Sequence, residues 1–289
     1  MRRKDTNMLY FFSGTLLIST IITIIGLIIP SSEPGNDQID MQELIFCWPV
    51  FRFVFMLIFG LGLISLDVYI LRKYRVNYMF IFGLDPHYKV THVQLIRVAM
   101  MLLTLWMLMF MLQVFISKLE YIFEDPAAWG ALVLIVVFVG LCCVPLHVFY
   151  LRSRAELLKT LGHIVIAPFG PVKFKDFFLA DILTSTVPIL RDAILMVFLF
   201  ASGQWHDIKS WVKYLDPKND HCERSKDMYM NWSSVEYLLL AVAFVPFWFR
   251  LMQCFRRFHE TKLVANLKNA GKYFTSMSVQ AAHVLAVVY

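Results

Sequence analysis

The sequence predicts an all-α, polytopic membrane protein with six full transmembrane helices, a partial seventh and a cytosolic N terminus. Three observations support this prediction. Hydrophobic residues make up 59% of the 289-residue chain, and apolar runs recur at about 20 residues, the length of helix that crosses a bilayer. Runs of that length without alternation are helices rather than barrel strands. Basic residues also gather in every second connecting segment, as the positive-inside rule requires.

The apolar runs give the expected spans in chain order. Six full runs and one partial run cover residues 9–30, 50–71, 93–117, 129–151, 177–202, 235–255 and 273–289. Arg2, Arg3 and Lys4 precede the first run as they would in a signal peptide, but the run is too long and no small-residue cleavage site follows. We therefore expect a retained first helix and an acidic outer loop in residues 1–49. The main transmembrane domain is expected in residues 50–289.

Lys and Arg predict which side of the membrane each connecting segment occupies. The segments 1–8, 72–92, 152–176 and 256–272, together with Arg97, hold 18 of the 27 basic residues. Because cytosolic segments carry the excess of Lys and Arg, these four segments are expected in the cytosol. The net charge of +6 is therefore a feature of topology, and no nucleic-acid partner is expected.

Residues 152–176 combine apolar and charged side chains. Leucines and isoleucines recur among Arg154, Glu156 and Lys159, which predicts a short amphipathic helix, and the turn sequence from Pro168 to Pro171 ends it. Such a helix often lies at the membrane surface ahead of a span. A plain cytosolic linker is an equally good interpretation.

Arg250 interrupts the predicted sixth span before its apolar run has ended. At about 3.6 residues per turn, Arg250, Gln253 and Arg257 share one helix face. A guanidinium at membrane depth costs roughly 2.5–3.5 kcal/mol, so it usually has a partner, a water-filled cavity or a bound anion. Its planar fork of donors matches phosphate or carboxylate. We expect an anion pathway here, although Arg257 fits equally well as a topology charge.

The predicted fifth span also carries polar residues. Asp181 and Thr184 share one face, and Pro188 predicts a kink. The functional interpretation is a pore-lining carboxylate that accepts a hydrogen bond from a protonated oxyanion. In the alternative, Asp181 only neutralises an arginine for packing. Arg191 and Asp192 point about 100° apart, so one of them is expected to pair with a neighbouring helix.

Two other basic residues receive separate interpretations. Arg52, in the second span, is interpreted as a side chain that snorkels to the membrane interface. Gly271 and Lys272 precede the last apolar run. If they open a helix, Lys272 and free backbone N–H groups would together favour an anion.

Enzyme motifs are missing from the sequence. It contains no His-Glu-x-x-His, no Gly-x-Ser-x-Gly and no Gly-x-x-x-x-Gly-Lys-Ser/Thr, and its eight histidines are scattered. We therefore expect no enzymatic activity, no metal site and no cofactor.

Several segments together resemble the EXS domain, the membrane part of phosphate exporters of the xenotropic and polytropic retrovirus receptor 1 type. They occur in the order and spacing of that family, and they are Val50-Phe51-Arg52, Val76 to Phe82 with Asp85-Pro86, Phe177 to Ser185, Trp248 to Arg257 with Thr261-Lys262, and Asn269 to Tyr273. The resemblance implies an exporter of inorganic phosphate. The anion-site residues of the family correspond to Asp181, Arg250, Lys272 and Tyr273, and Thr184 stands where the family usually has asparagine.

The expected phosphate-binding residues come from two sources, the resemblance to the family and the helix spacing. It comprises Asp181, Thr184, Arg250, Gln253, Arg257, Lys272 and Tyr273. Exporters of this type begin with a cytosolic SPX domain and continue with further helices and a second arginine cluster. The chain is therefore expected to be a partial EXS domain.

Three functions follow from the resemblance. The first is efflux of phosphate from the cytosol through an Arg- and Lys-lined path in the plasma membrane. The second is a Golgi or endoplasmic-reticulum role in which a shorter EXS protein supports retention of luminal glycosylation enzymes. The third is an inactive truncated partner of a full-length exporter. Expected partners are inorganic phosphate and the lipid bilayer, with a homodimer or a full-length EXS partner left open.

Overall fold

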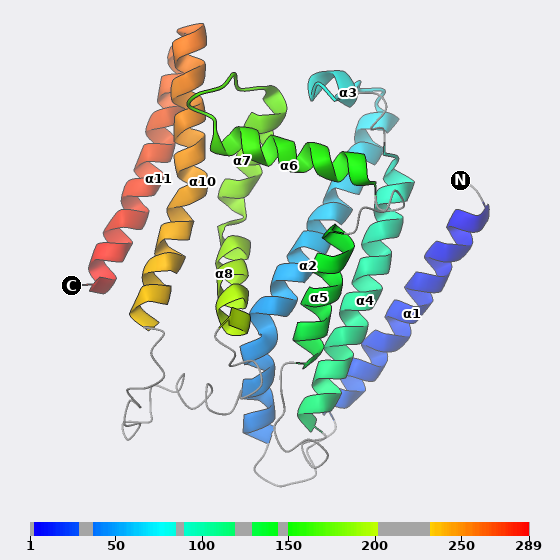
Figure 1. Cartoon of the computed structure of the whole chain (residues 1–289). Coiled ribbons are helices and arrows are strands. Elements are labelled where there is room, and N and C mark those ends of the chain that lie inside the picture. Colours follow the sequence, from blue (N-terminus) through cyan, green and yellow to red (C-terminus); the bar gives the residue numbers. More distant parts are fainter. Residues whose placement is uncertain are drawn as a thin grey trace. The chain divides into compact units, whose positions relative to one another are not determined.

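The computed structural model describes residues 3–28, 37–84, 90–118, 129–143, 150–201 and 232–288, and all regular structure in these ranges is helical (Figure 1). Within these ranges, three helices are long and apolar enough to cross a membrane: α1 (Arg3–Ile28), α2 (Asp37–Lys73) and α4 (His92–Lys118). A shorter apolar helix, α5, covers Trp129–Cys143. The prediction of an all-helical membrane protein is confirmed. The count of six full spans and the orientation of the N terminus stay predictions.

The chain divides into two compact units, and each is described by itself. The first unit comprises Met1–Ile70, Thr91–Val144 and Asp192–Met230. The second comprises Leu71–Val90, Pro145–Arg191 and Asn231–Tyr289.

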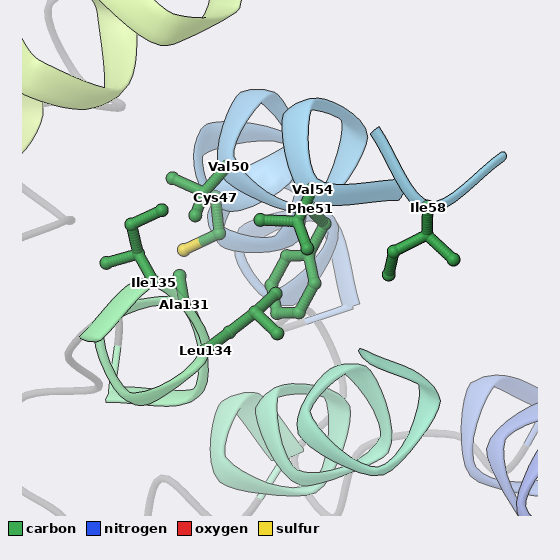
Figure 2. Close-up of a cluster of buried hydrophobic side chains, with 8 residues drawn as sticks. All are labelled: Cys47, Val50, Phe51, Val54, Ile58, Ala131, Leu134 and Ile135. Atoms are coloured by element: carbon green, nitrogen blue, oxygen red, sulfur yellow. The ribbon is translucent and has the colours of Figure 1, made fainter. Parts of the chain in front are cut away.

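The core of the first unit lies between α2 and α5. Its buried side chains are Cys47, Val50, Phe51, Val54 and Ile58 of α2 with Ala131, Leu134 and Ile135 of α5 (Figure 2). The α2 positions recur at intervals of three and four residues, so they form one stripe along the helix. From α4, the indole Nε1 of Trp106 donates a hydrogen bond of 2.8 Å to the carbonyl of Phe51. These contacts pack α2, α4 and α5 together.

An ion pair joins α2 to α8 (Val187–Ala201) in the same unit. Nε and Nη2 of Arg52 donate to the two carboxylate oxygens of Asp192 at 2.6 and 2.5 Å, and the Asp192 side chain is buried. The expectation that one member of the Arg191–Asp192 pair contacts a neighbouring helix is confirmed for Asp192. The interpretation that Arg52 snorkels to the membrane interface stays a prediction, and its guanidinium has Asp192 as a bidentate partner.

The second unit contains α3 (Tyr78–Ile81), α6 (Leu151–Val165), α7 (Phe174–Ser185), α10 (Trp232–Thr261) and α11 (Val264–Val288). Helices α10 and α11 form a hairpin whose turn passes through Lys262 at a positive φ of 57°. Helix α6 contacts α7 and α10 and runs crosswise to α10 and α11 (Figure 1). The amphipathic helix predicted within residues 152–176 is thus confirmed as α6, which ends before the Pro168–Pro171 turn.

The predicted fifth span is broken. Helix α7 ends at Ser185 and α8 begins at Val187. Pro188 has no N–H to donate to a preceding turn, so it is tolerated in the first turn of a new helix rather than inside a continuous one. The kink expected at Pro188 is therefore a full break centred on Thr186.

Two other expected boundaries moved. Helix α11 begins at Val264, so Gly271 and Lys272 lie inside a helix, and the expected helix start at this pair is wrong. Helix α2 begins at Asp37, so much of the expected acidic outer loop is helical. The end of the predicted fourth span, residues 144–149, lies outside the described residues.

Candidate functional site around Arg250

Arg250 is a buried cation within the second unit. Its neighbours Leu251 and Cys254 on α10 pack with Ala270 and Tyr273 of α11 in a buried cluster, and Arg250 itself is only 2% exposed. Because an isolated charge in such a place is strongly unfavourable, the surrounding groups must compensate for it.

The guanidinium of Arg250 is held by contacts from three helices. Nη1 donates to the carbonyl of Phe177 on α7 at 3.2 Å and to Oε1 of Gln253 at 3.1 Å. Nη2 donates to the hydroxyl of Tyr273 at 2.8 Å and lies 3.2 Å from Oδ1 of Asp181. The guanidinium carbon lies 3.6 Å from the centre of the Phe177 ring, in cation–π geometry. Within the described part of the chain, Nε has no hydrogen-bond partner.

Asp181 is the solvent-facing end of this network. The Tyr273 hydroxyl donates to its Oδ1 at 2.7 Å, and the Asp181 side chain is 55% exposed, compared with 3% for Arg250. A buried cation is therefore paired with an exposed carboxylate. An anion arriving at this exposed end would compete with Asp181 for the Nη2 donor and the tyrosine hydroxyl.

Gln253 bridges the arginine to the start of α7. Its amide oxygen accepts from Arg250, and its Nε2 donates to the carbonyl of Asp176 at 3.2 Å. The residue is fully buried. Both ends of the amide are thus occupied by protein groups, which makes Gln253 a residue that orients Arg250.

The other expected site residues lie at different distances from this network. The Lys272 ammonium is exposed and lies 5.1 Å from the centre of the Tyr273 ring. The Thr184 hydroxyl donates to the carbonyl of Asp181 at 2.7 Å. Arg257 donates to the carbonyl of Val172 at 3.4 Å. The structure therefore brings Asp181, Arg250, Gln253 and Tyr273 into contact, while Thr184 and Arg257 are engaged by backbone carbonyls.

Two residues of the network were not expected from the sequence. Phe177 covers the guanidinium with its ring, and the spacing of an aromatic residue on a helix more often indicates plain packing. Asp176 is 2% exposed and accepts from the N–H of Lys173 at 3.0 Å, capping α7. A carboxylate three residues into a helix is a recognisable capping signal, but its contact with α10 is visible only in three dimensions.

The chemistry available here is anion capture. Nη2 of Arg250 and the Tyr273 hydroxyl point to one carboxylate, and Lys272 adds a second positive charge on the exposed side. Within the described residues, no group of three or more His, Cys, Asp or Glu side chains is arranged to hold a metal ion. Fold and site together define the class as a helical membrane protein with a buried arginine facing an exposed carboxylate.

Comparison with known proteins identifies the family. The EXS family model matches residues 47–289, so this chain belongs to the EXS family. The resemblance seen in the sequence is thereby confirmed.

Three relatives illustrate how far the similarity extends. The chain is 30% identical over 254 residues to the SPX and EXS domain-containing protein 1 of Dictyostelium discoideum, covering 88% of this chain and 26% of that protein. It is 32% identical over 277 residues to the xenotropic and polytropic retrovirus receptor 1 homolog of Danio rerio, covering 93% and 36%. It is 30% identical over 282 residues to the phosphate transporter PHO1 homolog 1 of Arabidopsis thaliana, covering 95% and 33%. The chain thus spans about a third of the length of these relatives.

Proposed function

We propose that this chain transports inorganic phosphate out of the cytosol through a path that includes the Arg250 network. The observation that carries the proposal is the pairing of a buried guanidinium with the exposed carboxylate of Asp181. The name of the Arabidopsis relative, a phosphate transporter, supports phosphate as the anion. A transport role also accords with the absence of enzyme motifs from the sequence.

The mechanism is an exchange of anions at Arg250. Without substrate, Asp181 occupies the outer donor of the guanidinium. Phosphate bound as its monoanion offers bare oxygens to Arg250 and Tyr273 and a protonated oxygen to the Asp181 carboxylate. Lys272, exposed beside Tyr273, attracts the anion to the site. Thr184 and Arg257 join the path only after releasing their backbone carbonyls.

Membrane potential sets the direction. An inside-negative potential favours exit of an anion by about 2.3 kcal/mol per charge per 100 mV.

The proposal places the protein in the plasma membrane as a multi-pass protein with six full spans and a partial seventh. The Golgi or endoplasmic reticulum is the alternative membrane, and a homodimer or a complex with a full-length EXS protein is the alternative to a single chain. The division into residues 1–49 and 50–289 is part of the same proposal.

Substitution of Arg250 tests the proposal. Arg250→Ala removes the donors that would receive phosphate, so efflux of radiolabelled phosphate from cells expressing the chain should fall to background. Arg256→Ala is the matched control, because Arg256 lies on the same helix and pairs with Glu260 at the protein surface. Its efflux should equal that of the unmodified chain.

The amount of folded protein must be measured for each variant. Removal of Arg250 leaves Asp181 without its cation and Oε1 of Gln253 without its donor, so membrane expression and thermal unfolding are compared before efflux is interpreted. Equal efflux by Arg250→Ala and the unmodified chain at equal expression would remove Arg250 from the mechanism. No efflux by the unmodified chain, restored only by a co-expressed full-length EXS protein, would instead support the role of an inactive partner.

A further inference from the structure

One face of α6 is firmly attached to α7. The Lys175 ammonium binds the Glu156 carboxylate, and Nδ1 of His163 lies 3.7 Å from Oδ1 of Asp176. Ile164, next to His163 in the chain, is buried at 1% exposure. The rotation of α6 about its own axis is thereby set, and with it the direction of its remaining faces.

The opposite side of α6 is apolar and uncovered in the part of the chain that the structure describes. Leu158 is 68% exposed and Val165, seven residues later on the same face, is 60% exposed. The turn after the helix continues this surface with Ile166 at 56% and Phe169 at 85%. An apolar strip of this kind on a polar helix marks an interaction surface.

Basic residues border the strip. Arg152 and Lys159 on α6 and Lys173 after the turn are all exposed. The single carboxylate on the helix, Glu156, is already neutralised by Lys175. Among these described residues the basic side chains outnumber the one carboxylate, so the net charge beside the apolar strip is positive, which complements an anionic surface.

We propose that α6 and the turn through Phe169 form a binding surface for anionic phospholipids of the bilayer. Leu158, Val165, Ile166 and Phe169 enter the boundary between headgroups and acyl chains. Arg152 and Lys159 bind the lipid phosphates, as on helices that lie in the membrane interface.

Two features favour a bilayer over a protein partner. Helix α6 runs crosswise to α10 and α11 (Figure 1), so it runs parallel to the membrane plane if those helices cross the membrane. Helix α7, to which α6 is attached, begins only at Phe174 and leads into the predicted fifth span. The apolar strip therefore lies close in sequence to the point where the chain enters the bilayer.

The first experiment measures depth in the membrane. The full chain, with its native cysteines replaced, is reconstituted in vesicles containing phosphatidylserine and labelled with a fluorophore on Leu158→Cys, Phe169→Cys or Lys159→Cys. Nitroxide groups on lipid acyl chains should quench the label at positions 158 and 169, whereas aqueous iodide should quench it at position 159. Quenching of the labels at positions 158 and 169 by iodide would overturn the proposal. If neither quencher reached these labels, a protein segment would cover the strip, and the proposal would be overturned as well.

The second experiment tests the preference for anionic lipid. Nitroxide-labelled phosphatidylserine should quench position 158 more than the same fraction of labelled phosphatidylcholine. The extra quenching by phosphatidylserine should disappear in the double variant Arg152→Gln, Lys159→Gln. It should persist in the control variant Lys268→Gln, which removes an exposed charge from α11. Equal quenching by both lipids in the parent protein would overturn the anionic preference.

A third experiment uses the unmodified chain and measures hydrogen exchange. Amide hydrogen exchange in residues 151–170 should slow when phosphatidylserine is added to phosphatidylcholine vesicles. Exchange that is the same in both vesicles would contradict the proposal. None of the three measurements depends on phosphate transport, so the lipid surface and the proposed function stand or fall separately.

Discussion

Arg250 is buried, yet one of its contacts is with an exposed side chain. The groups around it include two side-chain oxygens and one backbone carbonyl, which compensate the charge, and the ring of Phe177 lies against its face. Among these described contacts, the one with Asp181 involves an exposed side chain. Exchange of the Asp181 contact for one with an external anion leaves the other contacts in place, so substrate binding need not unfold the core of the unit.

Gln253 should act through Arg250 rather than on the anion. Gln253→Leu leaves Arg250 Nη1 and the Asp176 carbonyl each short of one partner in a buried place, and we expect a loss of about 1–3 kcal/mol of stability. Thermal unfolding of the purified variant measures this loss, and efflux should show a raised KM for phosphate.

The variant Gln253→Glu separates orientation from packing. It keeps an acceptor for Arg250 but places a second carboxylate beside the guanidinium. Stability should recover relative to Gln253→Leu, while phosphate efflux should remain low because the positive charge is neutralised. A leucine variant with unchanged unfolding temperature and KM would show that Gln253 does not orient Arg250.

At the scale of elements, the approach of α5 to α4 depends on a glycine. A Cβ on Gly130 would lie 2.9 Å from the carbonyl oxygen of Met109 and from the side chain of Gln113, and the N–H of Gly130 donates to Oε1 of Gln113 at 2.9 Å. Small residues allow such close contact between membrane helices.

Gly130→Ala should therefore destabilise the first unit by about 1–3 kcal/mol, the usual effect of overpacking. Gly140→Ala on the same helix is the control, since its added Cβ would meet nothing within 4 Å. That change should be neutral or slightly stabilising. The comparison is made by thermal unfolding in detergent, and equal destabilisation by both variants would contradict the packing argument.

The contact between α6 and α7 should depend on pH. The hydrogen bond from Lys175 holds the pKa of Glu156 below its ordinary value, despite partial burial, which acts in the opposite direction. A carboxyl whose pKa is lowered by folding adds stability above its ordinary pKa of 4.5, and this stability is lost as the pH falls through the lowered folded value.

The variant Glu156→Gln should thus melt at a lower temperature than the parent at pH 7, by an amount that corresponds to about 1–2 kcal/mol. The difference should shrink as the pH falls below the ordinary pKa of 4.5 and through the lowered folded value, because the parent then loses the same charge. If the difference in melting temperature between the parent and Glu156→Gln stayed constant across this pH range, the Glu156–Lys175 pair would stabilise the protein by packing rather than by charge.

For the whole molecule, the distribution of basic residues predicts the topology. An epitope placed before residue 8 should be hidden from antibody in intact cells until the membrane is permeabilised, since the N terminus is expected in the cytosol. An epitope inside the segment 203–234 should be accessible without permeabilisation. For a protein of internal membranes, protease protection of sealed vesicles gives the same reading. An accessible N-terminal epitope would reverse the orientation.

Much of the molecule could be predicted from local sequence. Helices, their apolar character and the amphipathic α6 follow from composition and spacing within about 20 residues, because a membrane leaves few backbone alternatives. That Arg250 and Asp181 have polar partners was also predictable, because charges within apolar runs are unfavourable unless something compensates them.

The partners of these charges depended on the tertiary structure. Arg52 and Asp192 are 140 positions apart in the chain, and Asp181 and Tyr273 are 92 apart. Helical spacing states which face a residue occupies, but it does not state which other helix that face meets. The sequence by itself thus determined a helical membrane protein with an arginine inside an apolar run. Packing of α7, α10 and α11 decided that Gln253 orients this arginine and that Asp181 is its exposed partner, because those roles depend on contacts between distant segments.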